Sequence, residues 1–306
     1  MNITISGSLA YDRIMTFPEK FSDHILPDKI HVLNVCFLVD NVTENFGGTA
    51  GNISYALTLM GNSSAITATI GHDYRRYFKW LDKNDISTEG IVVIEEEFTA
   101  GAYITTDKGD NQITGFNPGA MKHSSNLDFG KLNPKETLMI VSPGNMEDMV
   151  NYPRSCKERG IFYIFDPGQQ IPVIAAEDMI DVITDCPLLI VNDYEFDMIL
   201  NKTGKSREEL MALANATVIT LGEEGSMLYT NGGSTKIEAA RAETVVDPTG
   251  CGDAFRGGLL SGLAAGKDLA ESCRLGSVCA SFAVETHGTQ EYTFTSEEFA
   301  HRLNGI

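Results

Sequence analysis

The sequence predicts an α/β protein with a three-layer α/β/α body, a mostly parallel central sheet and a small additional β-sheet. Short, continuously apolar runs with the character of buried strands recur along the chain. Helix-like runs lie between them, and this alternation predicts a parallel sheet covered by helices on both faces. Two segments rich in β-formers with no helix-like run between their strands predict the second sheet.

The elements of the body are expected at defined positions. The strands are expected at the short apolar or β-branched runs 2–6, 65–70, 138–142, 162–165, 188–192 and 218–221. The helices are expected where apolar residues recur at helical spacing: 51–60, 74–83, 177–185, 206–215 and 254–265.

The β-rich segments lie at about 13–46 and 92–117, with strands expected at 29–39, 102–106 and 112–116. We expect them to form a small sheet that is inserted into the body and acts as a lid. Since no repeat, low-complexity stretch or Pro/Ser linker divides the chain, residues 1–306 are expected to form a single domain.

Composition limits the partners. The chain has 306 residues and a net charge of −19, which argues against nucleic acid and anionic membranes. The N-terminus lacks a basic segment before an apolar stretch, and no apolar run approaches the roughly 20 residues of a membrane span. Six scattered cysteines without a CxxC pair favour reduced thiols. We therefore expect a cytoplasmic protein.

The run from Asp247 to Asp253, Asp-Pro-Thr-Gly-Cys-Gly-Asp, is the most specific feature of the chain. Its Gly-rich turn directly precedes a helix-like segment, so backbone N–H groups and the helix dipole can cradle a phosphate. Asp253 stands beside that cradle and can take a proton from an attacking hydroxyl. A plain Gly-rich helix entry does not explain this spacing, so the motif indicates a phosphotransferase.

Weaker motifs follow other strands or precede other helices. An acid or amide at these places can hold sugar hydroxyls or Mg²⁺, and a Gly-containing turn can touch a nucleotide. Each of them alone is equally typical of an ordinary turn or helix start. They are Asp12, Gly48 with Asn52, Asn192 with Glu195, and Thr220 with Gly222 and Gly225.

A possible Walker loop is excluded. Gly204-Lys205-Ser206 has the end of that motif, but Ile199 stands where its first glycine belongs. The turn before Asp253 is therefore the main phosphate cradle.

In this order, the motifs resemble the ribokinase-like PfkB family of carbohydrate kinases over nearly the whole chain. Segments such as 117–121, 166–170 and 288–291 extend the likeness to bacterial adenosine and nucleoside kinases. The resemblance implies transfer of the ATP γ-phosphoryl group to the 5′-hydroxyl of a ribonucleoside, first of all adenosine, in purine salvage. Alternatives are a broader inosine, guanosine or cytidine kinase, a sugar kinase such as ribokinase, and a non-catalytic nucleotide-binding sensor.

The resemblance also implies a role for each site residue. Asp253 would be the catalytic base, and the amides of Gly250, Cys251 and Gly252 would form the anion hole. The substrate-binding residues would be Ser8, Asp12, Gly48, Asn52, Tyr103, Phe116, Gln169 and Gln170, with Tyr103 a stacking partner of the base. The ATP-binding residues would be Asn192, Thr220, Gly222, Gly225 and Thr249. Glu195 would hold Mg²⁺ through waters, and Asp247 matches one ligand of a monovalent cation such as K⁺.

Several points stay open at the level of sequence. Arg256 lies one helical turn beyond Asp253 and could either meet a phosphate or pair with a neighbouring acid. The preferred nucleobase and the need for K⁺ are also open. An exposed edge of the small sheet would allow a homodimer.

Overall fold

The computed structural model describes residues 1–109 and 111–305, and the body is built on one long sheet. Within these residues the sheet has nine strands, and the pairs are parallel except for the two that β12 makes. The expectation of a mostly parallel sheet is confirmed. In spatial order the strands are β13 (Gly233–Ile237), β12 (Ser226–Thr230), β11 (Ala216–Thr220), β10 (Leu188–Asn192), β9 (Phe162–Phe165), β8 (Thr137–Val141), β1 (Asn2–Ser6), β4 (Ser64–Gly71) and β5 (Ile91–Ile94).

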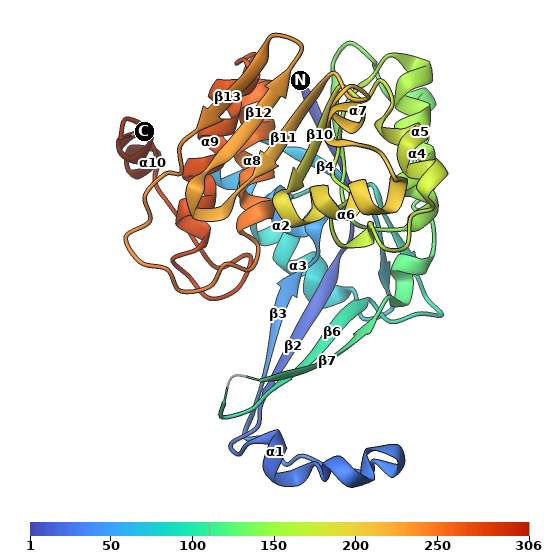
Figure 1. The fold of residues 1–306 in the computed structure, drawn as a ribbon, viewed down its shortest axis with the longest axis vertical. Helices are drawn as coiled ribbons and strands as arrows, with labels where there is room; N and C mark the ends of the chain where they lie inside the picture. Colours follow the sequence, from blue (N-terminus) through green and yellow to red (C-terminus); the bar gives the residue numbers. More distant parts are fainter. Residues whose placement is uncertain (110, 306) are drawn as a thin grey trace.

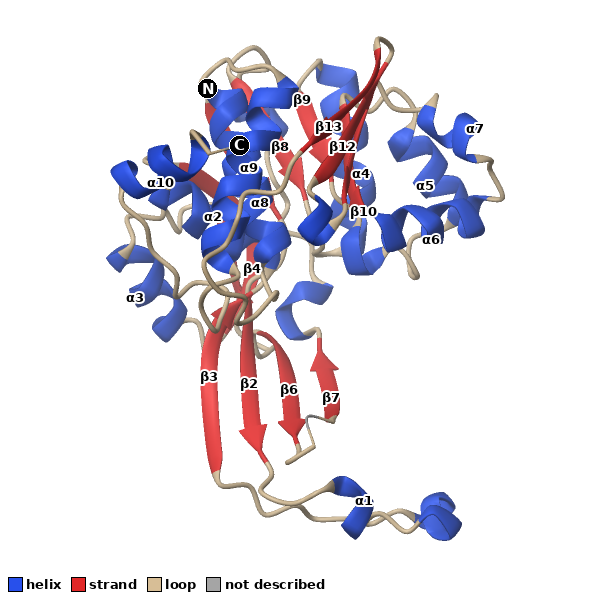
Figure 2. Ribbon diagram, turned by 60° about the vertical axis from the view of Figure 1, so that its left-hand side comes forward, coloured by secondary structure: helices blue, strands red, loops and turns tan. Residues whose placement is uncertain are grey.

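Helices cover both faces of this sheet (Figure 1, Figure 2). Because side chains alternate along a strand, Leu188 and Ile190 of β10 pack on one face and Leu189 and Val191 on the other. One face is covered by α2 (Thr49–Leu59), α3 (Arg75–Lys83), α8 (Cys251–Ala264) and α9 (Leu269–Ala283), with α10 (Ser296–Leu303) packed on α9. The other is covered by α4 (Met146–Arg159), α5 (Ala176–Ile183), α6 (Asp193–Thr203) and α7 (Arg207–Met211).

A second sheet extends from one end of the body (Figure 2). Its strand order is β3 (Asn41–Gly47), β2 (Ala10–Thr16), β6 (Ala100–Thr106) and β7 (Gln112–Asn117). Only three residues separate β1 from β2, so the carboxyl ends of the parallel strands face this small sheet. β5 belongs to the central sheet, so residues 92–94 lie outside the small one.

The expected strand at 29–39 is wrong. Beyond β2 the chain forms α1 (Phe21–His24), the 3₁₀ helix η1 (Pro27–Val32) and an irregular segment. The rings of Phe17, Phe21 and Phe37 meet with centroids 4.8–5.7 Å apart, so this segment folds onto itself instead of joining the sheet. We call residues 17–40 the arm.

The remaining 3₁₀ turns are short. They are η2 (Gly119–Lys122), η3 (Phe129–Lys131), η4 (Gly168–Gln170) and η5 (Gly222–Glu224).

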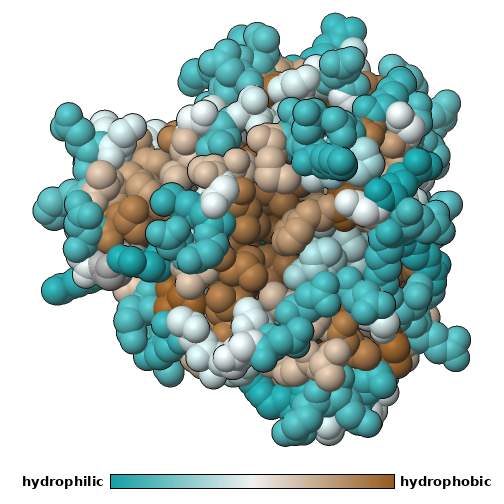
Figure 3. Space-filling view, turned by 90° about the horizontal axis from the view of Figure 1, so that it is seen from above, coloured by the Kyte–Doolittle hydropathy of each residue, from teal (hydrophilic) through white to brown (hydrophobic). Residues whose placement is uncertain are grey.

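The end of the body opposite the small sheet is apolar at its centre. Figure 3 shows hydrophobic residues gathered in a hollow there, with hydrophilic residues around it. The polar motifs of the sequence follow the carboxyl ends of the strands, so they lie at the other end. Within the described residues, no helix is long and apolar enough to cross a membrane.

Glycines allow α8 to pack closely on its neighbours. A Cβ atom at Gly258 would lie 2.5 Å from the carbonyl oxygen of Leu275 in α9. A Cβ at Gly257 would lie 2.4 Å from Cβ of Ala56 in α2. Any larger residue at these positions would push α8, and the motif at its start, away from α9 or α2.

We expect Gly258→Ala to destabilise the protein by about 1–3 kcal/mol, because the backbone that the methyl group meets has no room to move. Chemical denaturation measures this change. Gly115→Ala is the control, since a Cβ there meets nothing within 4 Å and should leave stability unchanged. Equal stability of the two variants would contradict the close packing.

Candidate active site

The start of α8 brings the proposed base to the carboxyl end of the sheet. Gly250 precedes the helix with a left-handed φ of 79°, a conformation that favours glycine. Asp253 then lies in the first turn, where Nδ2 of Asn52 in α2 donates to its Oδ2 at 2.7 Å. Two motifs that are 201 residues apart in sequence are thus in direct contact.

The N–H groups around this turn form an open cradle. The N–H of Cys251 donates to the Pro248 carbonyl at 3.2 Å and closes the turn. In the described part of the chain, no acceptor meets the N–H groups of Gly250, Gly252 and Asp253. These groups, at the positive end of the α8 dipole, are available to an anion.

Asp253 is partly buried, and its surroundings favour the protonated form. Burial is the main cause that raises the pKa of Asp253 to about 7, and the charges of Asp166 and Glu195 add to it. The Asn52 amide and the Arg256 guanidinium act in the opposite direction. A carboxyl with a pKa near neutrality suits a general base at physiological pH.

The structure shows a partner for Arg256. Its Nε and Nη2 donate to the two oxygens of Asp166 at 2.8 and 2.7 Å, and its Nη1 donates to the Gly252 carbonyl at 3.2 Å. The sequence left open whether this arginine meets a phosphate or an acid, and here it pairs with an acid.

Gln290 is a site residue that the motif analysis did not assign. Its Nε2 donates to Oδ1 of Asn52 at 2.9 Å and to the hydroxyl of Tyr77 at 3.0 Å. Nε1 of Trp80 donates to its Oε1 at 2.7 Å. Because Gln290 holds the oxygen of the Asn52 amide, the NH₂ group of that amide faces Asp253. Gln290 belongs to the segment 288–291, which resembles nucleoside kinases, and this resemblance is the feature of the sequence that could have identified Gln290 as a site residue.

Asp12 lies against the Gly47-Gly48 turn. A Cβ at Gly47 would be 2.4 Å from Oδ2 of Asp12, so glycine at position 47 leaves room for this carboxylate where it lies. Gly48 has a φ of 89° and sits against the backbone of Ser8 and Ala10. Burial raises the pKa of Asp12. The geometry brings together the residues expected to bind a polyol.

The side chain of Ser8 is hydrogen-bonded within the protein. Its buried hydroxyl accepts the N–H of Thr49 at 3.1 Å, at the start of α2. This contact explains the serine as a structural partner of the helix start.

A cavity of about 490 Å³ collects three residues expected near a nucleobase. These are Phe116, Gln169 and Gln170. An aromatic ring and two amides can stack on and hydrogen-bond to a flat heterocycle.

Tyr103, expected as a stacking partner of the base, is not among the residues that line this cavity. In the small sheet Ala102 pairs with both Asp12 and Phe116, while Tyr103 pairs with Arg13 and Gly115. Paired residues share a face, so Tyr103 faces away from Asp12 and Phe116.

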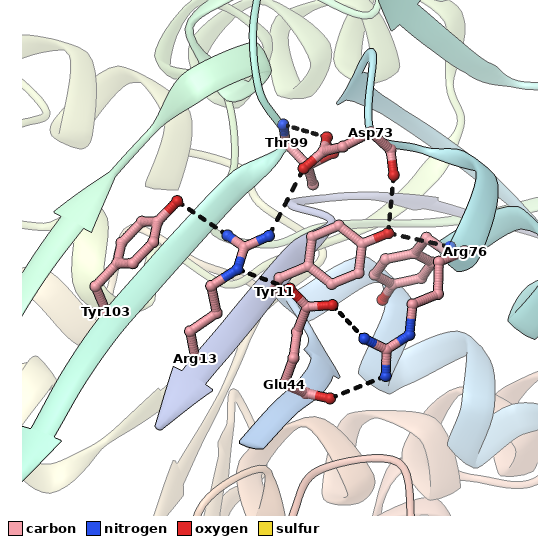
Figure 4. Close-up of polar contacts among 8 residues, drawn as sticks. Tyr11, Arg13, Glu44, Asp73, Arg76, Thr99 and Tyr103 are labelled. Atoms are coloured by element: carbon pink, nitrogen blue, oxygen red, sulfur yellow. Dashed lines mark hydrogen bonds and ion pairs between the residues drawn. The ribbon is translucent and has the colours of Figure 1, made fainter. Parts of the chain in front are cut away.

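A polar network occupies the Tyr103 face (Figure 4). Arg13 donates to the hydroxyl of Tyr103 at 3.0 Å and to Glu44 at 2.7 Å, and Arg76 of α3 also pairs with Glu44. Tyr11 donates to the backbone of Asp73 at 3.2 Å. These contacts tie the base of the small sheet to the body.

A second cavity, of about 670 Å³, adjoins the first turn of α8. Thr220, Gly222 and Gly225 line it together with Cys251 and Gly252. Its remaining lining is mostly apolar and comes from Ala239, Ala240, Ala242, Val245, Pro248, Phe255, Ala280 and Val284, among others. A ligand with a flat apolar part and an anionic end would fit between this lining and the cradle. Thr249 and Asn192 are not among the lining residues.

Asn192 and Glu195 form a capping box at the start of α6. Oδ1 of Asn192 accepts the Glu195 N–H at 2.7 Å, and Oε2 of Glu195 accepts the Asn192 N–H at 2.8 Å. Burial, then the charge of Asp166, raises the pKa of Glu195. Across the described residues, no group of three or more His, Cys, Asp or Glu could hold a metal ion by itself.

Asp247 stabilises the motif loop. Its Oδ1 accepts the Thr249 N–H at 2.9 Å and its Oδ2 accepts the Gly288 N–H at 3.3 Å. Burial raises its pKa, but these hydrogen bonds outweigh burial, and the pKa of Asp247 is lowered. The carboxylate is therefore charged and fixed beside the cradle.

Comparison with known proteins identifies relatives over the whole chain. Residues 12–295 match the family described as pfkB family carbohydrate kinase. The nucleoside kinase of Methanocaldococcus jannaschii is 30% identical over 303 residues, 98% of this chain and 96% of that protein. The structure of ligand-free Burkholderia thailandensis nucleoside kinase superposes with a TM-score of 0.88 at 41% identity, covering 98% of this chain and 99% of that one. The same enzyme in complex with ADP-inosine gives 0.84 at 40% identity, covering 99% and 95%.

We expect Asp253→Asn to stabilise the protein at pH 8. The folded-state pKa of Asp253, about 7, lies above the ordinary value of 3.8, so the folded state favours the proton. Between pH 3.8 and about 7 the unfolded chain loses this proton while the folded protein keeps it, so stability falls as the pH rises, and the asparagine avoids this loss. Thermal unfolding should show a gain that is largest at pH 8 and shrinks toward pH 5. A gain that is independent of pH would contradict the raised pKa.

Proposed function

Because the chain belongs to the pfkB family of carbohydrate kinases, and is thus a phosphotransferase, we propose that it is an ATP-dependent ribonucleoside kinase. It transfers the γ-phosphoryl group to the ribose 5′-hydroxyl and yields the nucleoside monophosphate. Adenosine is the proposed acceptor, with inosine, guanosine and cytidine as alternatives. A role in purine salvage follows from this acceptor. The six free cysteines, four of them buried, are consistent with work in the reducing cytoplasm.

One observation carries the proposal: the open N–H cradle beside Asp253 borders a cavity of about 670 Å³, and a second cavity of about 490 Å³ has an aromatic and amide lining. Thr220, Gly222 and Gly225 line the cavity that we assign to ATP, with Cys251 and Gly252 at its border. We assign the cavity with Phe116 and two glutamines to the nucleobase. The Burkholderia relative has been solved with inosine and with ADP-inosine, which supports a nucleoside and a nucleotide as the two ligands.

The residues of the chain then act on the acceptor as follows. Asp12, Gly48 and Asn52 hold the ribose, and Asp253 orients the 5′-hydroxyl and accepts its proton. The N–H groups of the cradle stabilise the charge on the transferring phosphoryl group. Since this transition state is loose, positioning and charge stabilisation provide most of the catalysis.

Two cations belong to the proposal. Mg²⁺ would neutralise charge on the ATP phosphates, held through waters by Glu195 and Asn192. Each of these side chains uses one oxygen in the capping box. Mg²⁺ keeps several of its waters in such sites, so the fit is compatible. Asp247, charged and fixed beside the cradle, would serve a monovalent cation such as K⁺.

A sugar kinase such as ribokinase is the alternative enzyme. A bare sugar would not need the aromatic and amide lining around Phe116 and Gln169, so this cavity favours a nucleoside. A non-catalytic sensor would not need a carboxyl with a pKa of about 7 in the cradle.

Release of ADP with a panel of adenosine, inosine, guanosine, cytidine, ribose and fructose tests these functions. We expect turnover with at least one purine nucleoside and much less with the sugars. Asp253→Asn should keep nucleoside binding and lose about 10²–10⁴-fold in kcat. Preference for a free sugar would overturn the proposal, and ATP binding without any turnover would support the sensor.

We also propose a homodimer formed through the arm. Its apolar side chains Leu26, Ile30, Val32, Leu33 and Leu38 are each more than half exposed. A monomer rarely leaves such a group in water, so a second copy of the chain is the proposed cover.

Sedimentation velocity tests the dimer. Leu38→Glu combined with Val32→Glu should give a monomer, because two charges would be buried in the interface. Val173→Glu, at a site of 65% exposure outside the arm, is the control and should leave the dimer intact. A monomeric wild-type protein would refute the proposal.

A further inference from the structure

We propose that Arg256 is a positioning residue for phosphoryl transfer. Paired with Asp166 inside the protein, it fixes the Gly252–Asp253 peptide, and with it the base and the cradle, and it does not contact a phosphate. This inference rests on the proposed kinase function and adds a residue pair to which no role has been assigned.

The pair is buried and its geometry is well defined. Arg256 is 6% exposed and Asp166 is 2% exposed. The two parallel hydrogen bonds of 2.8 and 2.7 Å form the bidentate contact that suits a planar guanidinium and a carboxylate. The third nitrogen, Nη1, is left for the Gly252 carbonyl at 3.2 Å.

Asp166 is itself fixed to the sheet. It directly follows β9, and its N–H donates to the Val141 carbonyl at the end of β8. The hydroxyl of Ser142 donates to its Oδ2 at 3.1 Å. The pair therefore connects the carboxyl ends of two central strands to the first turn of α8.

Contact with the Gly252 carbonyl adds a side-chain restraint to the direction of a cradle donor. The Gly252 carbonyl and the Asp253 N–H belong to one planar peptide unit, so holding the oxygen also orients the hydrogen. A Cβ at Gly252 would lie 3.2 Å from Nη1 of Arg256, which is a reason for glycine at this position.

Burial also keeps Arg256 away from a phosphate. If the guanidinium left to bind ATP, Asp166 would remain as a buried charge without its partner, which is strongly unfavourable. The bidentate pair has a net charge close to zero, so its electrostatic attraction for a phosphate is weak.

The charges of the pair act on Asp253 in opposite directions. Arg256 lowers the pKa of Asp253, while Asp166 and, from α6, Glu195 raise it. The other ionisable neighbours are an acid with a raised pKa, Asp12, and three groups whose raised pKa values keep them neutral near pH 7: Tyr77, Tyr292 and Cys251.

Single substitutions separate positioning from phosphate binding. We expect Arg256→Met and Asp166→Asn each to lower kcat by about 10²-fold with a change in KM for ATP of less than about threefold, because the reacting groups are misplaced while the ATP cavity is intact. Arg256→Lys should recover part of kcat. Arg154→Met is the control: Arg154 also pairs with two acids, Asp178 and Asp181, but on the surface of the body, and its loss should leave kcat unchanged.

The pH dependence is the second readout. The acidic limb of kcat should move to higher pH in Arg256→Met and to lower pH in Asp166→Asn. Carbon-13 NMR of aspartate carboxyls, with Asp253 assigned by Asp253→Asn, measures the same shifts without any acceptor. If the wild-type protein phosphorylates no nucleoside, the kinase proposal fails, and the NMR titration still decides this inference.

Two results would overturn the inference. A KM for ATP raised about tenfold or more in Arg256→Met at unchanged kcat would make Arg256 a phosphate ligand. Shifts of the Asp253 titration in the same direction in both variants would mean that the pair only supports the fold. If Arg256→Met does not fold, Asp166→Asn alone provides the comparison of kcat with KM and the expected shift of the Asp253 titration to lower pH.

Discussion

The first turn of α8 must leave N–H groups unpaired while the side chains around it are held in place. Asn52 donates a hydrogen bond to Asp253, and Arg256 donates to Asp166 and to the Gly252 carbonyl. These contacts restrict movement of the N–H groups that form the cradle. The close contacts of Gly257 and Gly258 with α2 and α9 keep the helix itself from shifting. An unpaired N–H group is unfavourable when buried, and it becomes useful only if the surrounding structure prevents the chain from satisfying it.

The charge of the chain makes this arrangement necessary. With a net charge of −19, the protein as a whole repels an anion such as ATP. Backbone N–H groups act over a few ångströms and are little affected by distant carboxylates that water and salt screen. Arg256, the cation in the first turns of α8, is already neutralised by Asp166. The cradle therefore acts through local geometry, and Arg241 adds a cation to the lining of the cavity beside it.

Patterns in the sequence predicted those strands and helices whose formation depends on residues close together in the chain. The buried strands and the helix after Asp253 follow from apolar runs and from the Gly-rich turn. The arm did not follow its β-forming composition, because Phe17, Phe21 and Phe37 gather the segment into a cluster of its own. Gln290 meets Asn52 across 238 residues, a contact that no local pattern contains. The face on which Tyr103 lies is set by pairing between distant strands, which residue type alone does not reveal.

The alternation of side chains along strand β2 constrains how this sequence can evolve. Asp12 faces the side that we assign to the acceptor, and Arg13, the next residue, faces the network that joins the small sheet to the body. Inserting or deleting one residue before Asp12 would exchange these faces and present a guanidinium to the acceptor. Substitutions in β2 can be tested one at a time by selection, but a change of its length alters both faces together. The length of this strand is therefore expected to be the least variable property of the small sheet, whatever happens to the amino acids along it.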